Sequence, residues 1–437
     1  MSALPTILCL LLASASFVSL GYWFIVGLET IRTLRLLPTA RAGLAVANEP
    51  ARRPARWPKV CIVIPAHNEQ VVIARVTESL RRQDYPDFSA VFALDRCTDE
   101  TLVRLQAAAA GDPRISWITI DHCPDDWAGK VHAVHQGSLT PAAKQAEVLL
   151  FTDADTIFDP RCLTATVALL IDRKADMLSL LSTLTARRWF EFAIQPVAGF
   201  QMLTQYPLRR ANRLKGRRPL ANGQFIMLTR RCYDAIGGHV ATRRHLLEDV
   251  QIARLVERAG LNQCLLMAGG MLRCEMYRSW PQFHRGWKRI FTELCGRSPR
   301  RLRRYALRLG LLNAALPLAS ILAVLAWLVA GDFRSDPLVI VTAVLGSLAL
   351  LTHWLALAIG LRWSGFGPYI APLHAPGALI VAWLMNQAAS DLTAGSTISW
   401  GGKSYNLSGT TTHSGEFVSH EHARVDRPAT GSDDSRP

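Results

Sequence analysis

Long uncharged apolar runs near both ends of the chain limit what it can fold into. Residues 1–28 carry no charged side chain, and two further uncharged runs cover residues 309–330 and 337–361. Each run is long enough to cross the hydrocarbon core of a bilayer. The first run has no basic start and continues beyond Ala13-Ser14-Ala15, which predicts a retained anchor rather than a signal peptide. The other two, joined by the short polar segment 331–336, predict a hairpin of two membrane-spanning helices.

The segment from Trp363 to Ser390 is also uncharged, but it contains Pro368, Pro372 and Pro376. Proline interrupts regular helices, so three arrangements stay open: a span, an interfacial helix or a re-entrant segment. The tail after Gly409 is rich in Ser, Thr, His and Asp and is expected to be disordered. A solvated tail is a simpler interpretation of its histidines than a metal site.

Basic residues flank the central region, which predicts that this region faces the cytoplasm. They follow the first run and precede the second: Arg32, Arg35, Arg41, Arg52, Arg53, Arg56, Arg300, Arg301, Arg303, Arg304 and Arg308. The net charge of +15 suits anionic lipid head groups or phosphorylated ligands. Nucleic-acid binding is not expected, because no zinc-finger or RNA-binding signature occurs. The nine cysteines form no CxxC pair, which favours reduced thiols and argues against structural zinc. The sequence therefore predicts a multi-pass protein of the inner, cytoplasmic membrane.

Between the apolar runs, short apolar segments alternate with helical patterns. Strands are expected at 60–64, 90–94, 115–120 and 148–151, and helices at 69–82, 99–109 and 130–138. Such alternation is typical of an α/β fold with a doubly wound, mostly parallel sheet. Ligands of these folds bind beyond the carboxyl ends of the strands, so the residues that follow each strand matter most.

Polar and acidic residues follow three of the expected strands. They are Pro65-Ala66-His67-Asn68-Glu69, the segment from Asp95 to Thr101, and Thr152-Asp153-Ala154-Asp155. Two carboxylates two residues apart at a strand end, such as Asp153 and Asp155, can face one Mg²⁺ or Mn²⁺ ion. That ion would neutralise the charge of a departing diphosphate. Alone, either aspartate is equally compatible with capping a turn.

The motifs after these strands, together with Glu248-Asp249, resemble those of family 2 glycosyltransferases with the GT-A fold. The resemblance covers residues 60–297. Further segments resemble hopanoid-associated, carotenoid and ceramide glycosyltransferases: Trp127-Ala128-Gly129-Lys130, Met276-Tyr277, Arg285-Gly286-Trp287 and Ile398-Ser399-Trp400-Gly401-Gly402-Lys403-Ser404-Tyr405. The implied fold is a doubly wound, mostly parallel sheet with helices on both faces, plus N-terminal and C-terminal transmembrane helices.

The resemblance also implies roles for single residues. Pro65, Ala66, Asn68 and Glu69 would line the nucleotide pocket, Asp95 would bind the base, and Lys130 would lie near the phosphates. Asp153 and Asp155 would face the diphosphate and the metal, whereas Arg285 and Trp287 would contact diphosphate or acceptor. Asp249, beside Glu248, would be the general base that deprotonates an acceptor hydroxyl. The simpler interpretations are a turn cap for Asp95, a solvated Lys130 and a helix N-terminal charge for Asp249.

Two departures from the family pattern shape the functional expectation. Leu94-Asp95 replaces a double aspartate, and Gln282-Phe283-His284-Arg285-Gly286-Trp287 has one residue too many for the QxxRW signature of processive synthases. We therefore expect an inverting, metal-assisted, non-processive transfer of a sugar from a nucleotide donor, of the UDP type, to a membrane lipid. A processive exopolysaccharide synthase and a non-catalytic membrane scaffold or lipid-binding protein are the alternatives.

The expected organisation divides the chain into seven segments. They are an anchor (1–30), a basic linker (31–58), a cytoplasmic catalytic domain (59–297), a basic juxtamembrane segment (298–308), a membrane region (309–390), the WGGKSY segment (391–408) and a tail (409–437).

Overall fold

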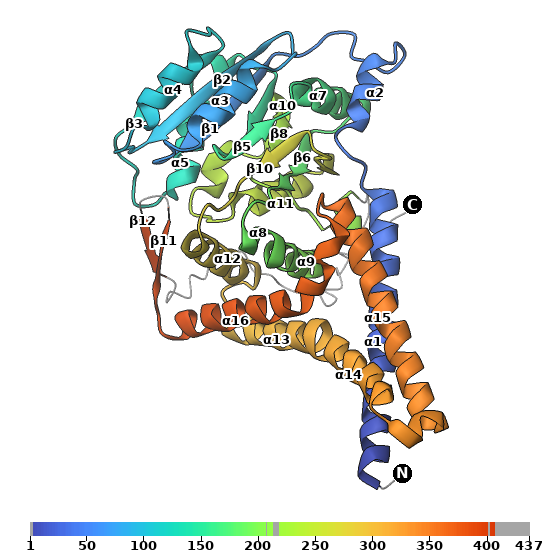
Figure 1. Cartoon of the computed structure of the whole chain (residues 1–437). Coiled ribbons are helices and arrows are strands. Elements are labelled where there is room, and N and C mark those ends of the chain that lie inside the picture. The colour runs from blue at the N-terminus through green and yellow to red at the C-terminus, as the bar shows by residue number, and fades with distance from the viewer. Residues whose placement is uncertain (1–2, 207, 213–217, 401–402, 407–437) are drawn as a thin grey trace, which may run out of the picture.

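The main sheet has seven strands in the order β3-β2-β1-β4-β8-β6-β9. The computed structural model describes residues 3–206, 208–212, 218–400 and 403–406. Neighbouring strands of the main sheet are parallel, except that β8 runs antiparallel to both β4 and β6 (Figure 1). The strands are β1 (Val60–Ala66), β2 (Phe88–Asp95), β3 (Ile115–Ile120), β4 (Val148–Phe151), β6 (Met177–Leu181), β8 (Ile226–Thr229) and β9 (Gln263–Met267). A smaller sheet has the order β5 (Thr156–Phe158), β10 (Leu272–Cys274) and β7 (Thr183–Leu184).

Alternating side chains of the strands build two separate cores. Ile62, Phe92 and Leu150 belong to one core, and Cys61 and Leu149 belong to the other, as the period of two along a strand requires. The first core is covered by α2 (Ala42–Asn48), α3 (Ile73–Arg81), α4 (Thr101–Ala109) and α7 (Cys162–Asp172). The second is covered by α5 (Gly129–Ser138), α6 (Pro141–Lys144), α10 (Arg230–Ala235) and α11 (Glu248–Arg258). The predicted α/β fold with helices on both faces is confirmed.

Several predicted boundaries were wrong. The first strand continues through Pro65, which is tolerated because β1 pairs with β4 only as far as Val63 and leaves that edge unpaired beyond it. The helix predicted from residue 69 begins at Ile73. The backbone amides of residues 69 and 70 donate hydrogen bonds to the Thr101 hydroxyl and the Asp99 carboxylate instead. The helix predicted from residue 99 likewise begins at Thr101.

Apolar helices extend from one side of this domain. Four segments are long and apolar enough to cross a membrane: Leu4–Leu36, Pro299–Leu328, Pro337–Trp363 and Pro368–Thr393. In Figure 1, α1 (Ala3–Leu36), α14 (Leu316–Leu328) and α15 (Pro337–Trp363) lie together and extend away from the sheet. The Thr342 hydroxyl donates to the Cys9 carbonyl, and Gly27 packs against Ala356, so α1 and α15 run in the same direction.

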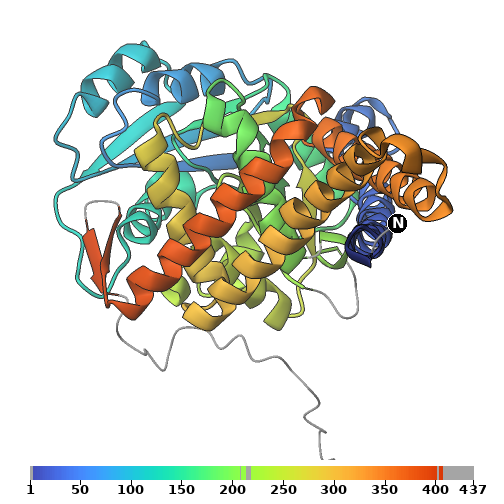
Figure 2. The same ribbon diagram turned by 60° about the horizontal axis from the view of Figure 1, so that its bottom comes forward.

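The fourth apolar segment takes a different course. After the 3-10 turn η5 (Pro368–Leu373), α16 (His374–Thr393) lies beside α13 (Pro299–Gly310), across the direction of α1 and α15 (Figures 1 and 2). A π-helical turn, η3 (Leu311–Ala315), connects α13 to α14. Above α16 lie α9 (Gln195–Gln205) and α12 (Trp280–Leu294), and α8 (Trp189–Ala193) precedes α9. Of the three arrangements left open, this geometry favours the interfacial one.

Trp23 joins the apolar helices to the domain. Its side chain is completely buried, and its ring lies 4.2 Å from that of His353 on α15 and 5.5 Å from that of His374 on α16, centroid to centroid. Phe200 of α9 stacks on it at 6.3 Å. His374 Nε2 in turn lies 3.1 Å from Asn313 Oδ1 on η3. This contact, called the Trp23 junction below, therefore involves one residue from each of five elements.

The chain continues after α16 into a hairpin of β11 (Thr397–Trp400) and β12 (Lys403–Asn406). Much of the WGGKSY segment thus forms this hairpin, whereas Gly401 and Gly402 lie outside the described residues. The tail expected to be disordered, residues 409–437, also lies outside them.

Candidate active site

Five acidic side chains from separate segments gather at one edge of the main sheet. Asp153 and Asp155 follow β4, Glu69 follows β1, and Glu248 and Asp249 open α11. The antiparallel β8 contributes as well, because its first residue pairs with the last residue of β4 and brings the preceding Gly223 to the same edge. The Thr152 hydroxyl secures this approach by donating to the Gln224 carbonyl at 2.7 Å.

Lys130 links the two halves of this carboxylate cluster. Its Nζ lies 2.7 Å from Asp153 Oδ1 and 2.7 Å from Glu248 Oε1. Burial alone would lower the pKa of Lys130, but the two carboxylates outweigh burial and raise that pKa above its ordinary value. Burial would likewise raise the pKa of Glu248, but Lys130 holds it below its ordinary value. The ammonium and the Glu248 carboxylate therefore both stay charged.

Asp249 is held by backbone amides. Val250 N donates to Oδ1 at 2.7 Å, and Gly223 N donates to Oδ2 at 3.0 Å. Burial first, and then the neighbouring Glu248 charge, raise the pKa of Asp249 to about 6. A carboxylate with this pKa is mostly ionised at neutral pH and is well placed to accept a proton.

Gly223 is required by close packing in the cluster. A Cβ at this position would lie 3.1 Å from Lys130 Nζ, 3.5 Å from Asp249 Oδ2 and 3.6 Å from Glu248 Oε1. The absence of a side chain thus lets the backbone approach the charged groups.

Asp153 and Asp155 have the properties of a cation site. Asp155 Oδ1 is buried without a hydrogen-bond partner. Burial, and then the charges of Asp153 and Glu69, raise the pKa of Asp155 to about 8, and burial is the main reason that the pKa of Glu69 rises to about 7. A divalent cation would relieve this repulsion. The described residues contain no group of three or more protein ligands, so donor phosphates and water would complete the coordination, as is usual for Mg²⁺.

The loops after β1 and β2 hold each other at the same edge. Asn68 adopts a left-handed backbone conformation (φ 56°), and its Oδ1 accepts the Thr98 amide at 2.8 Å. The Asp95 side chain is buried and accepts from Arg96 Nε at 2.9 Å and from Arg96 Nη2 at 2.6 Å. A base that bonded to Asp95 would have to share it with Arg96 or displace it. The roles of Pro65, Ala66, Asn68 and Asp95 stay predictions.

A model of the glycosyltransferase-like family 2 matches residues 58–275. This match spans every member of the carboxylate cluster. The chain contains a family 2 glycosyltransferase domain. It is accordingly an enzyme of the glycosyltransferase class.

Three solved structures that are similar to this chain are the following. The mannosyltransferase PcManGT from Pyrobaculum calidifontis, in complex with GDP-Man and Mn²⁺, is 17% identical with a TM-score of 0.44, covering 86% of this chain and 99% of that one. Glucosyl-3-phosphoglycerate synthase from Mycobacterium tuberculosis, in complex with Mn²⁺, UDP-glucose and phosphoglyceric acid, is 17% identical with a TM-score of 0.37, covering 55% and 79%. S. aureus TarS is 14% identical with a TM-score of 0.35, covering 57% and 39%. No curated protein matches the sequence.

Two residues expected at the glycosyltransferase site are not part of the cluster. Trp287 is buried between α12 and α16 beside Phe283 and Phe291, because positions four apart lie on one face of a helix. Its expected contact with diphosphate or acceptor stays a prediction, which the 2% exposure of the side chain does not favour. Arg285 is exposed on α12. Burial raises the pKa of Tyr277, and Arg289, also on α12, opposes that rise, whereas the Asp155 charge adds to it.

Sequence reasoning missed a second charged network beside Asp155. The Glu275 amide donates to the Asp155 carbonyl at 3.2 Å. The Glu275 carboxylate pairs with Arg75 Nη2 and with Arg188 Nη1, each at 2.7 Å. Because these residues are far apart along the chain, no local sequence motif predicts that they are in contact. The nearest signal was the acidic residue directly before the quoted Met276-Tyr277.

An aromatic pair lies next to these charged residues. The rings of Trp189 and Trp280 are 5.1 Å apart, and Trp189 is 52% exposed. Trp189 follows the Arg188 that pairs with Glu275, and Trp280 is two residues from Arg278, which lowers the burial-raised pKa of Glu69. This Trp189–Trp280 pair offers an apolar surface close to the acidic groups.

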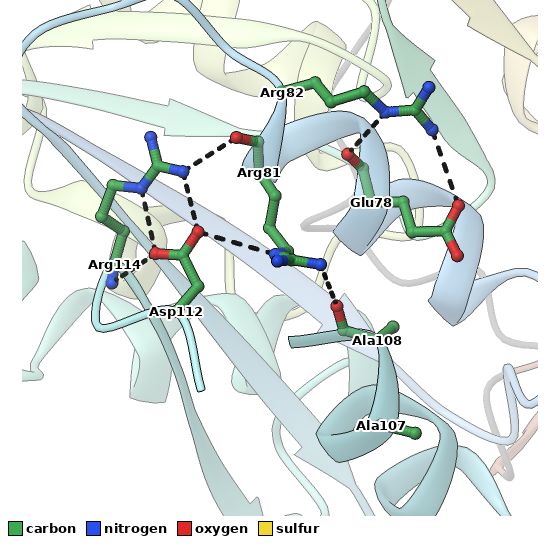
Figure 3. Close-up of a pocket in the computed structure, with 7 residues that line it drawn as sticks. All are labelled: Glu78, Arg81, Arg82, Ala107, Ala108, Asp112 and Arg114. Atoms are coloured by element: carbon green, nitrogen blue, oxygen red, sulfur yellow. Dashed lines mark hydrogen bonds and ion pairs between the residues drawn. The ribbon is translucent and has the colours of Figure 1, made fainter. Parts of the chain in front are cut away.

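One hollow on the domain lies away from the carboxylate cluster. A cavity of about 440 Å³ is bordered by the ends of α3 and α4 and by the start of β3, at the opposite end of the strands from the carboxylate cluster (Figure 3). Its arginines are already paired: Arg114 and Arg81 with Asp112, and Arg82 with Glu78. The hollow therefore offers no free charge for a phosphorylated ligand.

Proposed function

We propose that this protein transfers one sugar from a nucleotide-sugar donor, of the UDP type, to a hydroxyl of a membrane lipid, with inversion at the anomeric carbon. The observation that carries the proposal is the carboxylate cluster, in which Lys130 joins Asp153 to Glu248 while backbone amides hold Asp249. In this arrangement, Asp153 and Asp155 form one side, for a cation and the diphosphate, and Asp249 forms the other side, which accepts a proton.

In the proposed reaction, Asp249 takes the proton of the acceptor hydroxyl as its oxygen attacks the anomeric carbon. A bond forms between that oxygen and the sugar, the bond from the sugar to the diphosphate breaks, and the nucleoside diphosphate leaves. One displacement with one base inverts the configuration. The Asp249 pKa of about 6 keeps the base ionised at neutral pH.

Asp153 and Asp155 would hold a Mg²⁺ or Mn²⁺ ion, and the orphaned Asp155 Oδ1 supports that assignment. When bound, the ion would neutralise charge on the leaving diphosphate. Lys130 adds a fixed positive charge on the same side. The segments around Pro65, Asn68 and Asp95 would hold the nucleotide.

A lipid acceptor and a cytoplasmic-membrane location are part of the proposal. Supporting them are the apolar helices, the basic flanks of the domain and the Trp189–Trp280 pair, of which Trp189 is exposed. The domain limits expected from the sequence fit the same arrangement, with residues 59–297 as the catalytic unit on the cytoplasmic side.

The test uses the full-length protein in lipid nanodiscs with a panel of nucleotide sugars and Mg²⁺ or Mn²⁺. We expect release of nucleoside diphosphate that lipid extract stimulates, that chelation abolishes and that Asp155→Asn loses, together with a lipid product of inverted configuration. Products of increasing length would instead favour a processive synthase. A folded protein that binds no nucleotide sugar would overturn the proposal in favour of a scaffold.

A further inference from the structure

The helices α13 and α16 form a flat underside of the domain. They lie side by side in both views, below α9 and α12 and across the direction of α1 and α15 (Figures 1 and 2). Because α13 continues through η3 directly into the apolar α14, this underside adjoins the point where the chain would enter the bilayer.

The two faces of α13 differ in chemistry. Leu302, Ala306 and Leu309 are buried in the core that includes Leu384 and Met385 of α16. The opposite face is exposed and carries four arginines around one leucine: Arg300, Arg303, Arg304, Leu307 and Arg308. Spacings of three and four residues put these five side chains on one side of the helix. Arginine around an apolar centre is the pattern of a helix that lies in a membrane interface.

These four arginines form no ion pair within the part of the chain that the structure describes, which distinguishes them from the basic linker. There, Arg52 pairs with Asp172 at 2.8 Å and Arg56 pairs with Glu147. Near the end of α1, Arg32 pairs with Glu29 at 3.0 Å. The first basic cluster is therefore partly neutralised, with Arg35, Arg41 and Arg53 outside its ion pairs, whereas all four exposed α13 arginines keep their charge available for an external anion.

The neighbouring helix α16 also carries exposed apolar side chains, and the ring of one of them, Trp383, lies 5.4 Å from that of His284 on α12. Leu379 is 57% exposed and Trp383 is 47% exposed, whereas the intervening Val381 and Ala382 are buried. Tryptophan is enriched at the level of lipid head groups, where its ring meets apolar chains and its N–H meets water.

We propose that the α13 arginines bind the head groups of anionic phospholipids and thereby hold the catalytic domain against the membrane surface. The partner is the lipid surface itself, because the charge is uncompensated, lies on one face and adjoins the apolar helices. The attraction acts in addition to the spanning helices and sets how the domain rests on the leaflet. It needs neither donor nor acceptor, so it stands apart from the proposed function.

The test compares full-length protein in nanodiscs of phosphatidylcholine with increasing shares of phosphatidylglycerol. Lipids retained on extraction are quantified by mass spectrometry. The test variant carries Arg303→Gln, Arg304→Gln and Arg308→Gln. A control with the same loss of charge changes exposed arginines elsewhere on the domain: Arg104→Gln, Arg244→Gln and Arg258→Gln.

We expect the wild type and the control to enrich phosphatidylglycerol, and high salt to weaken that enrichment. The test variant should lose about fivefold in preference per arginine, roughly a hundredfold for three. Arg→Lys at the same three positions should restore most of it, because lysine keeps the charge; this also separates charge from misfolding. Equal enrichment in the test variant and the wild type, or equal loss in the control, would overturn the proposal.

Discussion

Replacing Asp249 by asparagine separates a catalytic role from a structural one, because the two roles predict opposite changes in stability. The substitution keeps the size of the side chain and removes its charge. Ionisation of Asp249 opposes folding, since burial and Glu248 raise its pKa to about 6. This penalty is absent below about pH 4, grows as pH rises through about 6 and stays constant above that. It amounts to at most about 3 kcal/mol.

Asparagine does not recover all of this free energy. The carboxylate accepts two amides, from Gly223 and Val250, and an asparagine oxygen can replace only one acceptor position. The unmatched amide costs about 1–3 kcal/mol. The variant should therefore unfold at the same temperature as the wild type or slightly above it at pH 7, while its rate of sugar transfer falls by about 10²–10⁴.

Both quantities are measured on the same preparation, by thermal unfolding and by release of nucleoside diphosphate. Glu257→Gln, on the same helix but outside the carboxylate cluster, serves as the control and should leave the rate unchanged. If Asp249→Asn unfolds at a lower temperature and loses activity only in proportion to its folded fraction, Asp249 is a structural residue at the start of α11 and the reasoning fails.

Three further substitutions test the surroundings of the base. Lys130→Met leaves the buried Glu248 carboxylate and the half-buried Asp153 carboxylate without their shared ammonium partner, so we expect a loss of about 3 kcal/mol in unfolding free energy and weaker donor binding by calorimetry. Gly223→Ala puts a methyl group 3.1 Å from the Lys130 amine and should lower kcat about tenfold or more, whereas Gly199→Ala, where a Cβ meets nothing within 4 Å, should not. Trp189→Ala should raise KM for the lipid acceptor without changing KM for the donor, and Trp117→Ala, an exposed control on β3, should change neither.

The sequence predicted the fold well because its main signals are local. Four strands and the helices between them follow from periodicity, and the limits of β3 and β4 are correct to the residue. The predicted start of α3 was wrong because the amides of residues 69 and 70 form hydrogen bonds with a loop that is distant in sequence. The course of α16 could not be read either, since its composition suits a span and only its packing on α13 places it along the underside.

The site residues that directly follow strands could be predicted from the sequence. Those whose position depends on tertiary packing could not. Asp153, Asp155, Asp249 and Lys130 were named from their motifs, and the structure brings them together. The burial of Trp287 could not be predicted, because a tryptophan can serve a binding site or a core and only the helical phase of α12 puts it among Phe283 and Phe291. The Glu275 network depends on contacts between distant segments, which a single sequence does not reveal.

The Trp23 junction has a consequence for the choice of acceptor. By packing on α15, α16 and α9 at once, Trp23 fixes the angle between the apolar helices and the catalytic domain. With α1 and α15 embedded, the elevation of Asp249 above the bilayer is then constant. For the proposed transfer to a membrane lipid, this constant elevation would favour lipids whose hydroxyl reaches the height of Asp249 over lipids whose hydroxyl stays deeper in the bilayer.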